Sequence, residues 1–227
     1  MPEPLSRPAR RIRPADPGDT DALYDICLRT GLHGEDASAV HRDPRLLGEV
    51  YVGPYLAHAL DLAFVVADDQ DNPLGYVLGV EDTAAFETWA ESSWWPGLRA
   101  RYPLGTYPAG SADEQVVRLI HAPERTPRTV VEAYPAHLHV DLLPTAQGGG
   151  NGRRLLETLF GALRARGMPG VHLGVSTRNP RAVAFYGHLG FETLDADEHG
   201  ARLALHLNPH PPHPAPSPRL PDARAEG

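Results

Sequence analysis

The chain of 227 residues contains no lysine, and arginine supplies all 21 of its basic residues. This absence excludes a P-loop, because that phosphate-binding motif requires a lysine. The 29 acidic residues bring the net charge to −8, which argues against a nucleic-acid groove or a patch for an anionic membrane. The sequence also lacks an N-terminal signal peptide and an apolar run of about 18 residues, so we expect a cytoplasmic protein with no membrane segment.

Cysteine is nearly absent as well, since Cys27 is the only one in the chain. It therefore has no partner for an internal disulfide. Cys27 lies among Leu23, Ile26 and Leu28 in a helical pattern, which favours a buried thiol over a catalytic nucleophile.

Composition divides the chain into three parts. Residues 1–9 form a proline-spaced leader, and residues 208–227 form a proline-rich tail that is predicted to be disordered because it has few large apolar residues. Residues 10–207 have the size of one domain. Within them, residues 83–134 form a long insertion that holds all three tryptophans, which predicts a satellite core or, alternatively, the wall of a binding pocket.

Hydrophobic periodicity predicts an α+β fold. Period-two alternation and short apolar runs indicate strands, and apolar stripes at helical spacing indicate helices. We expect one domain with a mixed, mostly antiparallel sheet of six or seven strands and helices on both faces. The predicted strands cover residues 10–13, 63–67, 74–80, 136–144, 171–176, 191–194 and 201–207. The predicted helices cover residues 19–29, 44–59, 113–124, 151–166 and 179–190.

A glycine-rich turn, residues 148–152, lies where the strand at 136–144 gives way to a helix. The first turn of a helix has unpaired N–H groups and partial positive charge, which suit phosphate oxygens, and glycine lets a pyrophosphate approach the backbone closely. Taken alone, the glycines are equally well explained by a flexible turn. The spacing of Gly148, Gly150 and Gly152 does not match the G-x-G-x-x-G fingerprint of dinucleotide-binding folds.

The turn belongs to the first of two motifs, Gln147-x-x-Gly150-x-Gly152, and the second motif follows it as Asn179-x-x-Ala182-x-x-Phe185-Tyr186-x-x-Leu189-Gly190-Phe191. In this order and at this separation they are similar to the two signature motifs of GNAT acetyltransferases. A wider pattern across residues 10–207 resembles bacterial acetyltransferases that are similar to the C-terminal acetyltransferase-like domain of eukaryotic O-GlcNAcases. The eukaryotic domain lacks a good glycine loop, whereas this chain keeps one.

The resemblance implies a site for acetyl-CoA between the strands at 136–144 and 171–176, which would splay apart. Backbone groups at the end of the first strand would hold the pantetheine and polarise the thioester carbonyl. Amides of the glycine turn would hold the pyrophosphate, and an asparagine would bond the pantetheine arm. Tyr186 would protonate the departing CoA thiolate, and its alternative role is a core aromatic in an apolar helix stripe. The implied cofactor residues are Leu142, Leu143, Gln147, Gly148, Gly149, Gly150, Asn151, Gly152, Arg153, Arg154, Asn179 and Tyr186.

Three residues are candidates for the general base. Glu81 and Asp82 follow the strand at 74–80, and Asp82 is also in position to cap a following helix. His137 shares one strand face with His139 and Asp141, and histidine titrates near neutral pH. A polar sheet face beneath the insertion explains that triplet equally well. Its members lie about 7 Å apart in turn, too far to share one ion, so no metal is predicted.

The identity of the acceptor stays open at this stage. No serine or cysteine lies in a nucleophile arrangement, which favours direct transfer in a ternary complex, and we expect the amine of a small molecule to receive the acetyl group. The alternatives are a protein or peptide acetyltransferase and a catalytically silent acyl-CoA-binding module. A homodimer is expected only by analogy with the family.

Overall fold

A computed structural model describes residues 10–198 and 200–207, so the leader at 1–9 and the tail at 208–227 lie outside the described residues. Its centre is a seven-stranded sheet with the order β1-β2-β3-β4-β5-β7-β6. Only the central pair β4 and β5 is parallel, which confirms the mixed, mostly antiparallel sheet. The strands are β1 (Arg11–Pro14), β2 (Ala63–Ala67), β3 (Pro73–Val80), β4 (Ala136–Leu142), β5 (Gly170–Ser176), β6 (Glu192–Ala196) and β7 (Gly200–His206).

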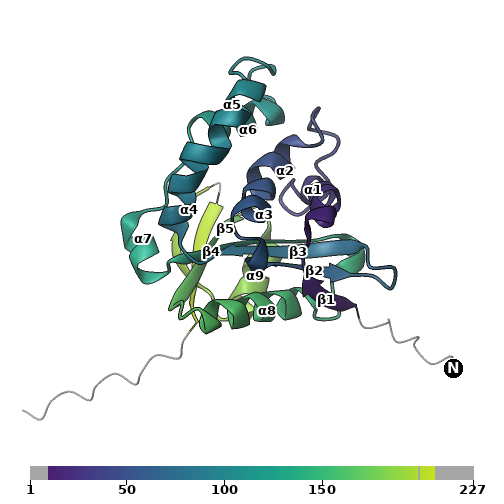
Figure 1. The fold of residues 1–227 in the computed structure, drawn as a ribbon, viewed down its shortest axis with the longest axis vertical. Helices are drawn as coiled ribbons and strands as arrows, with labels where there is room; N and C mark the ends of the chain where they lie inside the picture. The colour runs from purple at the N-terminus through teal and green to yellow at the C-terminus, as the bar shows by residue number, and fades with distance from the viewer. Residues whose placement is uncertain (1–9, 199, 208–227) are drawn as a thin grey trace, which may run out of the picture.

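Helices cover both faces of the sheet, as predicted (Figure 1). On one face, α8 (Asn151–Ala165) packs across β2, β3 and β4 with an apolar stripe that is fully or almost fully buried. On the other face lie α1 (Thr20–Leu28), α2 (Leu46–Tyr51) and α3 (Gly53–His58) (Figure 1). After β5 comes α9 (Pro180–His188). The buried stripe of α8 consists of Leu155, Leu156, Leu159, Phe160 and Leu163.

The single helix predicted for residues 44–59 is in fact two short helices. They meet at Val52, whose φ of −127° and ψ of −55° are not helical. The cause is Pro54, since proline has no N–H to donate to the carbonyl of Val50, four residues earlier, and its ring clashes with that carbonyl, so one continuous helix cannot run through this point. The break turns α3 so that Tyr55 is buried against the sheet.

The insertion at 83–134 joins the main core and forms no separate satellite. Its aromatic residues belong to the same hydrophobic cluster as the sheet, and the indole N–H of Trp94 donates to the carbonyl of Glu49 at 2.9 Å. The sequence predicted α6, and it placed Asp82 to cap a following helix, which is α4, but it missed α5 and α7. The elements of the insertion are α4 (Thr83–Trp89), a π-helical turn (Ala90–Trp94), α5 (Trp95–Arg101), α6 (Ala112–His121) and α7 (Arg128–Ala133).

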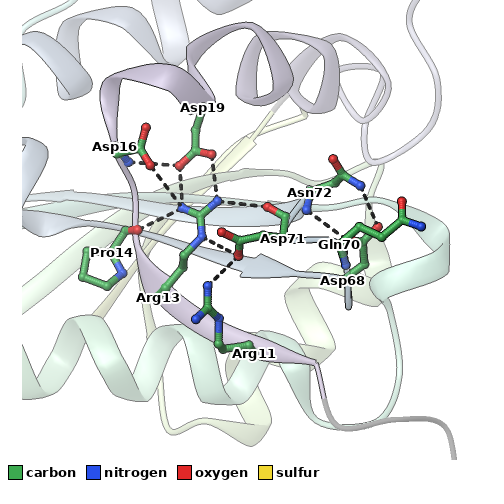
Figure 2. A network of polar contacts seen from close by, with 9 residues as sticks. All are labelled: Arg11, Arg13, Pro14, Asp16, Asp19, Asp68, Gln70, Asp71 and Asn72. Atoms are coloured by element: carbon green, nitrogen blue, oxygen red, sulfur yellow. Dashed lines mark hydrogen bonds and ion pairs between the residues drawn. The ribbon is translucent and has the colours of Figure 1, made fainter.

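An arginine clamp fixes the edge strand β1 to the rest of the domain (Figure 2). The guanidinium of Arg13 donates two bonds to the carboxylate of Asp19, at 2.7 and 2.9 Å, and a third to Asp71 at 2.9 Å. Asp19 precedes α1 and Asp71 lies in the turn between β2 and β3. The bonds from Arg13 lower the pKa of the Asp19 carboxyl, so this carboxylate stabilises the fold in its ionised form.

Candidate active site

The parallel strands β4 and β5 separate after a short contact. Their register joins Ala136 to Val171 and His137 to His172, and the paired region ends there. Beyond that point β4 stays paired with β3 as far as Leu142, and β5 stays paired with β7 along its whole length. The two strands therefore diverge with their outer edges held, which leaves a gap between their inner edges.

Some backbone N–H groups near the end of β4 point into this gap. The N–H of Leu143 donates to the carbonyl of Leu74 on β3 at 2.9 Å, so Leu143 has no N–H to offer a ligand. Because N–H direction alternates along a strand, the N–H groups of Leu142 and Val140 point the other way, toward β5. The side chain of Gln147 donates to the Leu142 carbonyl at 2.9 Å and holds the chain as it leaves the strand.

The glycine turn has a conformation that favours glycine at three successive positions. Gly148, Gly149 and Gly150 have φ values of 77°, 60° and 77°, in the left-handed region. A Cβ at any of the three would meet no atom within 4 Å, so this side of the turn is open. The N–H of Arg154 donates to the Gly150 carbonyl at 3.0 Å, and the N–H of Asn151 makes a long bond of 3.5 Å to the Gly148 carbonyl. The N–H groups of the three left-handed glycines are the ones placed to meet an anion.

The polar side chains around the turn differ in whether they are bonded to the chain itself or left available to a ligand. The amide of Asn151 is buried and donates to the Ala146 carbonyl at 2.9 Å, which stabilises the turn itself. Arg154 donates to the Arg10 carbonyl at 3.0 Å. Arg153 is exposed, and its guanidinium lies 3.6 Å from Glu157. Arg153 is therefore the more available of the two arginines for a phosphate.

Helix α9 begins and is positioned as predicted. The side chain of Asn179 accepts a hydrogen bond from Ala182 N–H at 3.0 Å and caps the helix. Gly34, in the loop that follows α1, lies directly against the side chain of Asn179. A Cβ at Gly34 would be only 2.6 Å from the Asn179 amide nitrogen.

Tyr186, on the same helix, is 7% exposed and lies between the rings of Phe185 and Phe191, each at 5.5 Å. Among the described residues its hydroxyl has no hydrogen-bond partner. Burial and the charge of Asp141 raise the pKa of Tyr186, so the phenol keeps its proton at neutral pH. The ring of Tyr186 is thus buried, while its protonated hydroxyl is unengaged and available to donate a hydrogen bond to a ligand.

A cavity of about 300 Å³ lies at the point where β4 and β5 separate. Its floor is formed by residues 137–139 of β4 and 172–174 of β5, and its walls come from helices, from the loop between α6 and α7, and from Arg202 of β7. The insertion supplies much of that wall, so its aromatic residues serve both the core and the cavity. The wall includes Val50, Tyr51, Tyr55, Phe86, Glu87, Ala90, Trp95 and residues 123–126.

The three candidate bases lie in different surroundings. His137 lines the cavity, whereas Glu81 and Asp82 are not part of its lining. Asp82 accepts a bond from Ala85 N–H at 2.9 Å and caps α4, and Glu81 is 3.3 Å from the guanidinium of Arg166. Of the three candidates, His137 alone lines the cavity, and both carboxylates are engaged elsewhere.

Both histidines of β4 that face the cavity are held neutral. Burial lowers the pKa of His137 well below its usual value, with His139 and His172 adding to the effect, and burial lowers the pKa of His139 to about 4. Asp141 accepts a bond from the Tyr76 hydroxyl at 2.6 Å instead of facing the histidines. Within the described ranges, no group of three or more His, Cys, Asp or Glu side chains is placed to hold a metal ion.

Sequence reasoning missed several of the residues around His137. The hydroxyl of Tyr55 lies 2.7 Å from Nε2 of His137, and the hydroxyl of Thr83 lies 2.8 Å from Nδ1. His172 adds a third ring to the cavity floor. Tyr55 is 82 residues from His137 in the chain, so no local pattern links the two.

A gap between β4 and β5, an open glycine turn and a tyrosine on the following helix together match one family. A model of the acetyltransferase (GNAT) family matches residues 38–191, more than half of the chain. The chain belongs to this family. It is therefore an acetyltransferase that uses acetyl-CoA, and the open turn and the gap are of the kind that this ligand needs.

Similar proteins agree with this assignment. The GNAT chain is 28% identical to the protein O-GlcNAcase of Rattus norvegicus over 194 residues, which cover 84% of this chain and 21% of that protein. It is 40% identical over 78 residues to the mycothiol acetyltransferase of Streptomyces bingchenggensis, covering 34% of this chain and 23% of that protein. The chain thus spans about a fifth of the length of these relatives.

Solved structures share the fold. The crystal structure of SsHAT is 40% identical and superimposes with a TM-score of 0.83, covering 89% of this chain and all of that one. The structure of yncA from Salmonella typhimurium with its cofactor acetyl-CoA is 18% identical, with a TM-score of 0.52 over 91% of this chain and 98% of that one. In the described part of the GNAT chain, no helix combines the length and apolar character required to cross a membrane. A cytoplasmic location stays a prediction.

Proposed function

We propose that this GNAT enzyme transfers the acetyl group of acetyl-CoA directly to the amine of a small molecule within a ternary complex. The observation that supports a small acceptor is the cavity at the divergence of β4 and β5, which helices and the insertion surround with aromatic rings. Such a recess suits a compact molecule with an apolar body better than an extended peptide.

The cofactor residues are assigned by their places around the gap. We propose that the N–H groups of Gly148, Gly149, Gly150, Gly152 and Arg153 and the side chain of Arg153 or Arg154 serve the pyrophosphate. Gln147 and Asn151 would hold the turn in shape, since their N–H groups and side chains are bonded to the chain itself. The N–H of Leu142 would contact the pantetheine or the thioester carbonyl, and Asn179 would contact the pantetheine arm. Leu143 is proposed only as packing, since its N–H is bonded to Leu74.

Each chemical task then has a group of suitable character. Acetyl-CoA supplies an activated thioester whose sulfur is a good leaving group. A fixed N–H of β4 would stabilise negative charge that develops on the carbonyl oxygen. The protonated phenol of Tyr186 would donate to the leaving sulfur, and the group that accepts the acceptor's proton would come from the cavity around His137.

The test is a comparison of acceptors in a thiol-release assay. Wild-type protein with acetyl-CoA is offered 2-phenylethylamine, benzylamine and spermidine, and in parallel short peptides with a free N-terminus or a lysine. We expect at least one small amine to give a higher kcat/KM than every peptide. A peptide that outperforms all small amines would favour a protein acetyltransferase. For direct transfer, initial rates should give intersecting double-reciprocal lines, and parallel lines would contradict it.

A further inference from the structure

Tyr55, His137 and Thr83 form a continuous hydrogen-bonded chain that begins at the cavity. The Tyr55 hydroxyl is 2.7 Å from Nε2 of His137, and Nδ1 of His137 is 2.8 Å from Oγ1 of Thr83. The Thr83 hydroxyl in turn lies 2.7 Å from the carbonyl oxygen of Pro135. Tyr55 is 5% exposed and Thr83 is 1% exposed, so this chain is shielded from bulk water except through the cavity.

The contacts of Thr83 determine which ring nitrogen of His137 carries the proton. A hydroxyl has one proton, and a carbonyl oxygen can only accept. If Thr83 donated to His137, its oxygen would face the Pro135 oxygen at 2.7 Å with no proton between them, which is repulsive. Thr83 therefore donates to Pro135 and accepts from Nδ1–H of His137. Because His137 is neutral, its Nε2 has a lone pair and accepts from the Tyr55 hydroxyl.

This polarity leaves the Tyr55 oxygen with lone pairs on the side of the cavity. We propose that Tyr55 is a catalytic residue that accepts the proton of the acceptor amine while passing its own proton to Nε2 of His137, with Thr83 as a positioning residue that sets the tautomer. The inference rests on the proposed function, because it requires an amine in this cavity. It also assigns to His137 an indirect role, since Tyr55 stands between its Nε2 and the acceptor.

The proton count closes over one turnover. The amine nitrogen forms a bond to the acetyl carbon and gains positive charge, and one of its protons passes to Tyr55 as the Tyr55 proton reaches His137. The carbon–sulfur bond breaks, its electron pair leaves on sulfur, and Tyr186 supplies the proton that makes the CoA thiol. The imidazolium of His137 then loses a proton to water and Tyr186 regains one, so the products are the amide and CoA.

The surroundings of Tyr55 favour a relay, in which Tyr55 takes up one proton as it gives up another, over a mechanism in which Tyr55 is first ionised. Burial, together with Tyr51 and Glu87, raises the pKa of Tyr55, so a lasting phenolate is unfavourable there. A proton that arrives at Tyr55 must therefore move on in the same event. The lone pair of Nε2 of His137 can receive it, but burial lowers the pKa of His137 and disfavours a lasting imidazolium, so the proton must pass on to water within the same turnover.

The first test is spectroscopic and needs no acceptor. In intact protein labelled with ¹⁵N-histidine, we expect the His137 Nδ1 signal to be that of a protonated nitrogen and the Nε2 signal that of an unprotonated one. Tyr55→Phe should shift the Nε2 signal by removing its donor. Thr83→Ser should keep the wild-type tautomer of His137, because serine retains the hydroxyl that accepts from Nδ1–H. Thr83→Val removes this acceptor and should not keep the tautomer. A protonated Nε2 in the wild-type protein would overturn the inference.

The second test separates chemistry from structure by comparing two buried, hydrogen-bonded tyrosines. Tyr55→Phe should lower kcat by about 100-fold, the usual contribution of a proton-transfer group, with the KM for acetyl-CoA unchanged. Tyr102→Phe is the matched control: Tyr102 is 6% exposed, its hydroxyl donates to Asp43 at 3.0 Å, it lies outside the cavity lining, and its replacement should leave kcat unchanged.

The acceptor in this second test is whichever of 2-phenylethylamine, benzylamine, spermidine or the peptides the wild-type protein acetylates fastest. Equal kcat values for the two variants would refute the relay. If a peptide is fastest but Tyr55→Phe is still selectively slow, the relay survives and only the small-molecule acceptor fails. If the wild-type protein acetylates nothing, the relay is refuted as a catalytic device whatever the tautomer.

Discussion

Replacement of Gly150 by alanine tests whether the glycine turn is a phosphate site or merely a flexible connection. Gly150 has a φ of 77°, and Gly110, in a turn before α6, has a φ of 78°. At neither position would a Cβ meet an atom within 4 Å. Both substitutions should therefore cost only the left-handed backbone strain of alanine, about 1–2 kcal/mol in the free energy of unfolding. Gly110→Ala is thus a matched control for stability.

The two variants should differ in binding. A Cβ at Gly150 would stand on the open side of the turn, where it would keep a phosphate oxygen from its N–H donors. The loss of one charge-assisted hydrogen bond costs about 1.5–3 kcal/mol, which is a weakening of the Kd for acetyl-CoA by about 10- to 150-fold. Calorimetric titration measures the Kd, and urea unfolding measures stability. Equal affinity of both variants for acetyl-CoA would refute the phosphate site.

Three further predictions concern protonation. Tyr186→Phe should lower kcat by about 100-fold or more with the Kd for acetyl-CoA unchanged, and a wild-type kcat for the best acceptor would contradict its role as acid. Because the pKa of His139 is lowered to about 4, the unfolded chain binds a proton that the folded chain refuses, so stability should fall as the pH drops from about 6.5 toward 4. His139→Gln should flatten that part of the urea-unfolding profile, and an unchanged slope would count against a buried neutral ring. Asp19→Asn should lower the free energy of unfolding at pH 7 by about 2 kcal/mol, since it removes the buried carboxylate that accepts two bonds from Arg13 and leaves only Asp71 as its close ionic partner. In the wild-type protein, the stability that Asp19 contributes should be lost as the pH falls below about 4 through its lowered pKa. The control Asp21→Asn removes only an exposed ion pair and should have little effect; equal losses would contradict the clamp.

Much of the fold could be predicted from the sequence, because its central elements have strong periodicity and clear boundaries. The strand at β2 matches the predicted residues 63–67, and α8 begins at Asn151 as expected. Both predicted caps are confirmed, since Asp82 caps α4 and Asn179 caps α9. Local hydrogen-bonding rules suffice for such features, because the partners are only three residues apart.

The helices missed by the sequence have weak local signals. In α7 the six residues are flanked by prolines and tyrosine, and only Val130 is buried, so no apolar stripe marks the helix. The short segment is held by tertiary contacts, which override local propensity. The same holds for the break between α2 and α3, where the sequence pattern continues but Pro54 interrupts the backbone.

Only those parts of the site whose residues lie close together in the sequence could be predicted. The glycine turn, Asn179 and Tyr186 lie in continuous motifs, whereas the cavity draws on residues from every part of the domain. His137 was a candidate from its strand face, but its bonds to Tyr55 and Thr83 depend on how α3 and α4 pack over the sheet. Side chains brought together by packing leave no signal at any fixed spacing.

A crystal structure of this protein with acetyl-CoA tests the central claim most directly. We expect the pyrophosphate oxygens to accept hydrogen bonds from N–H groups of residues 148–153, the pantetheine to pass between β4 and β5, and the Tyr186 hydroxyl to lie within hydrogen-bonding distance of the sulfur. The acetyl group should open onto the cavity beside Tyr55. A cofactor bound outside the gap, or a Tyr186 hydroxyl directed away from the sulfur, would contradict the account.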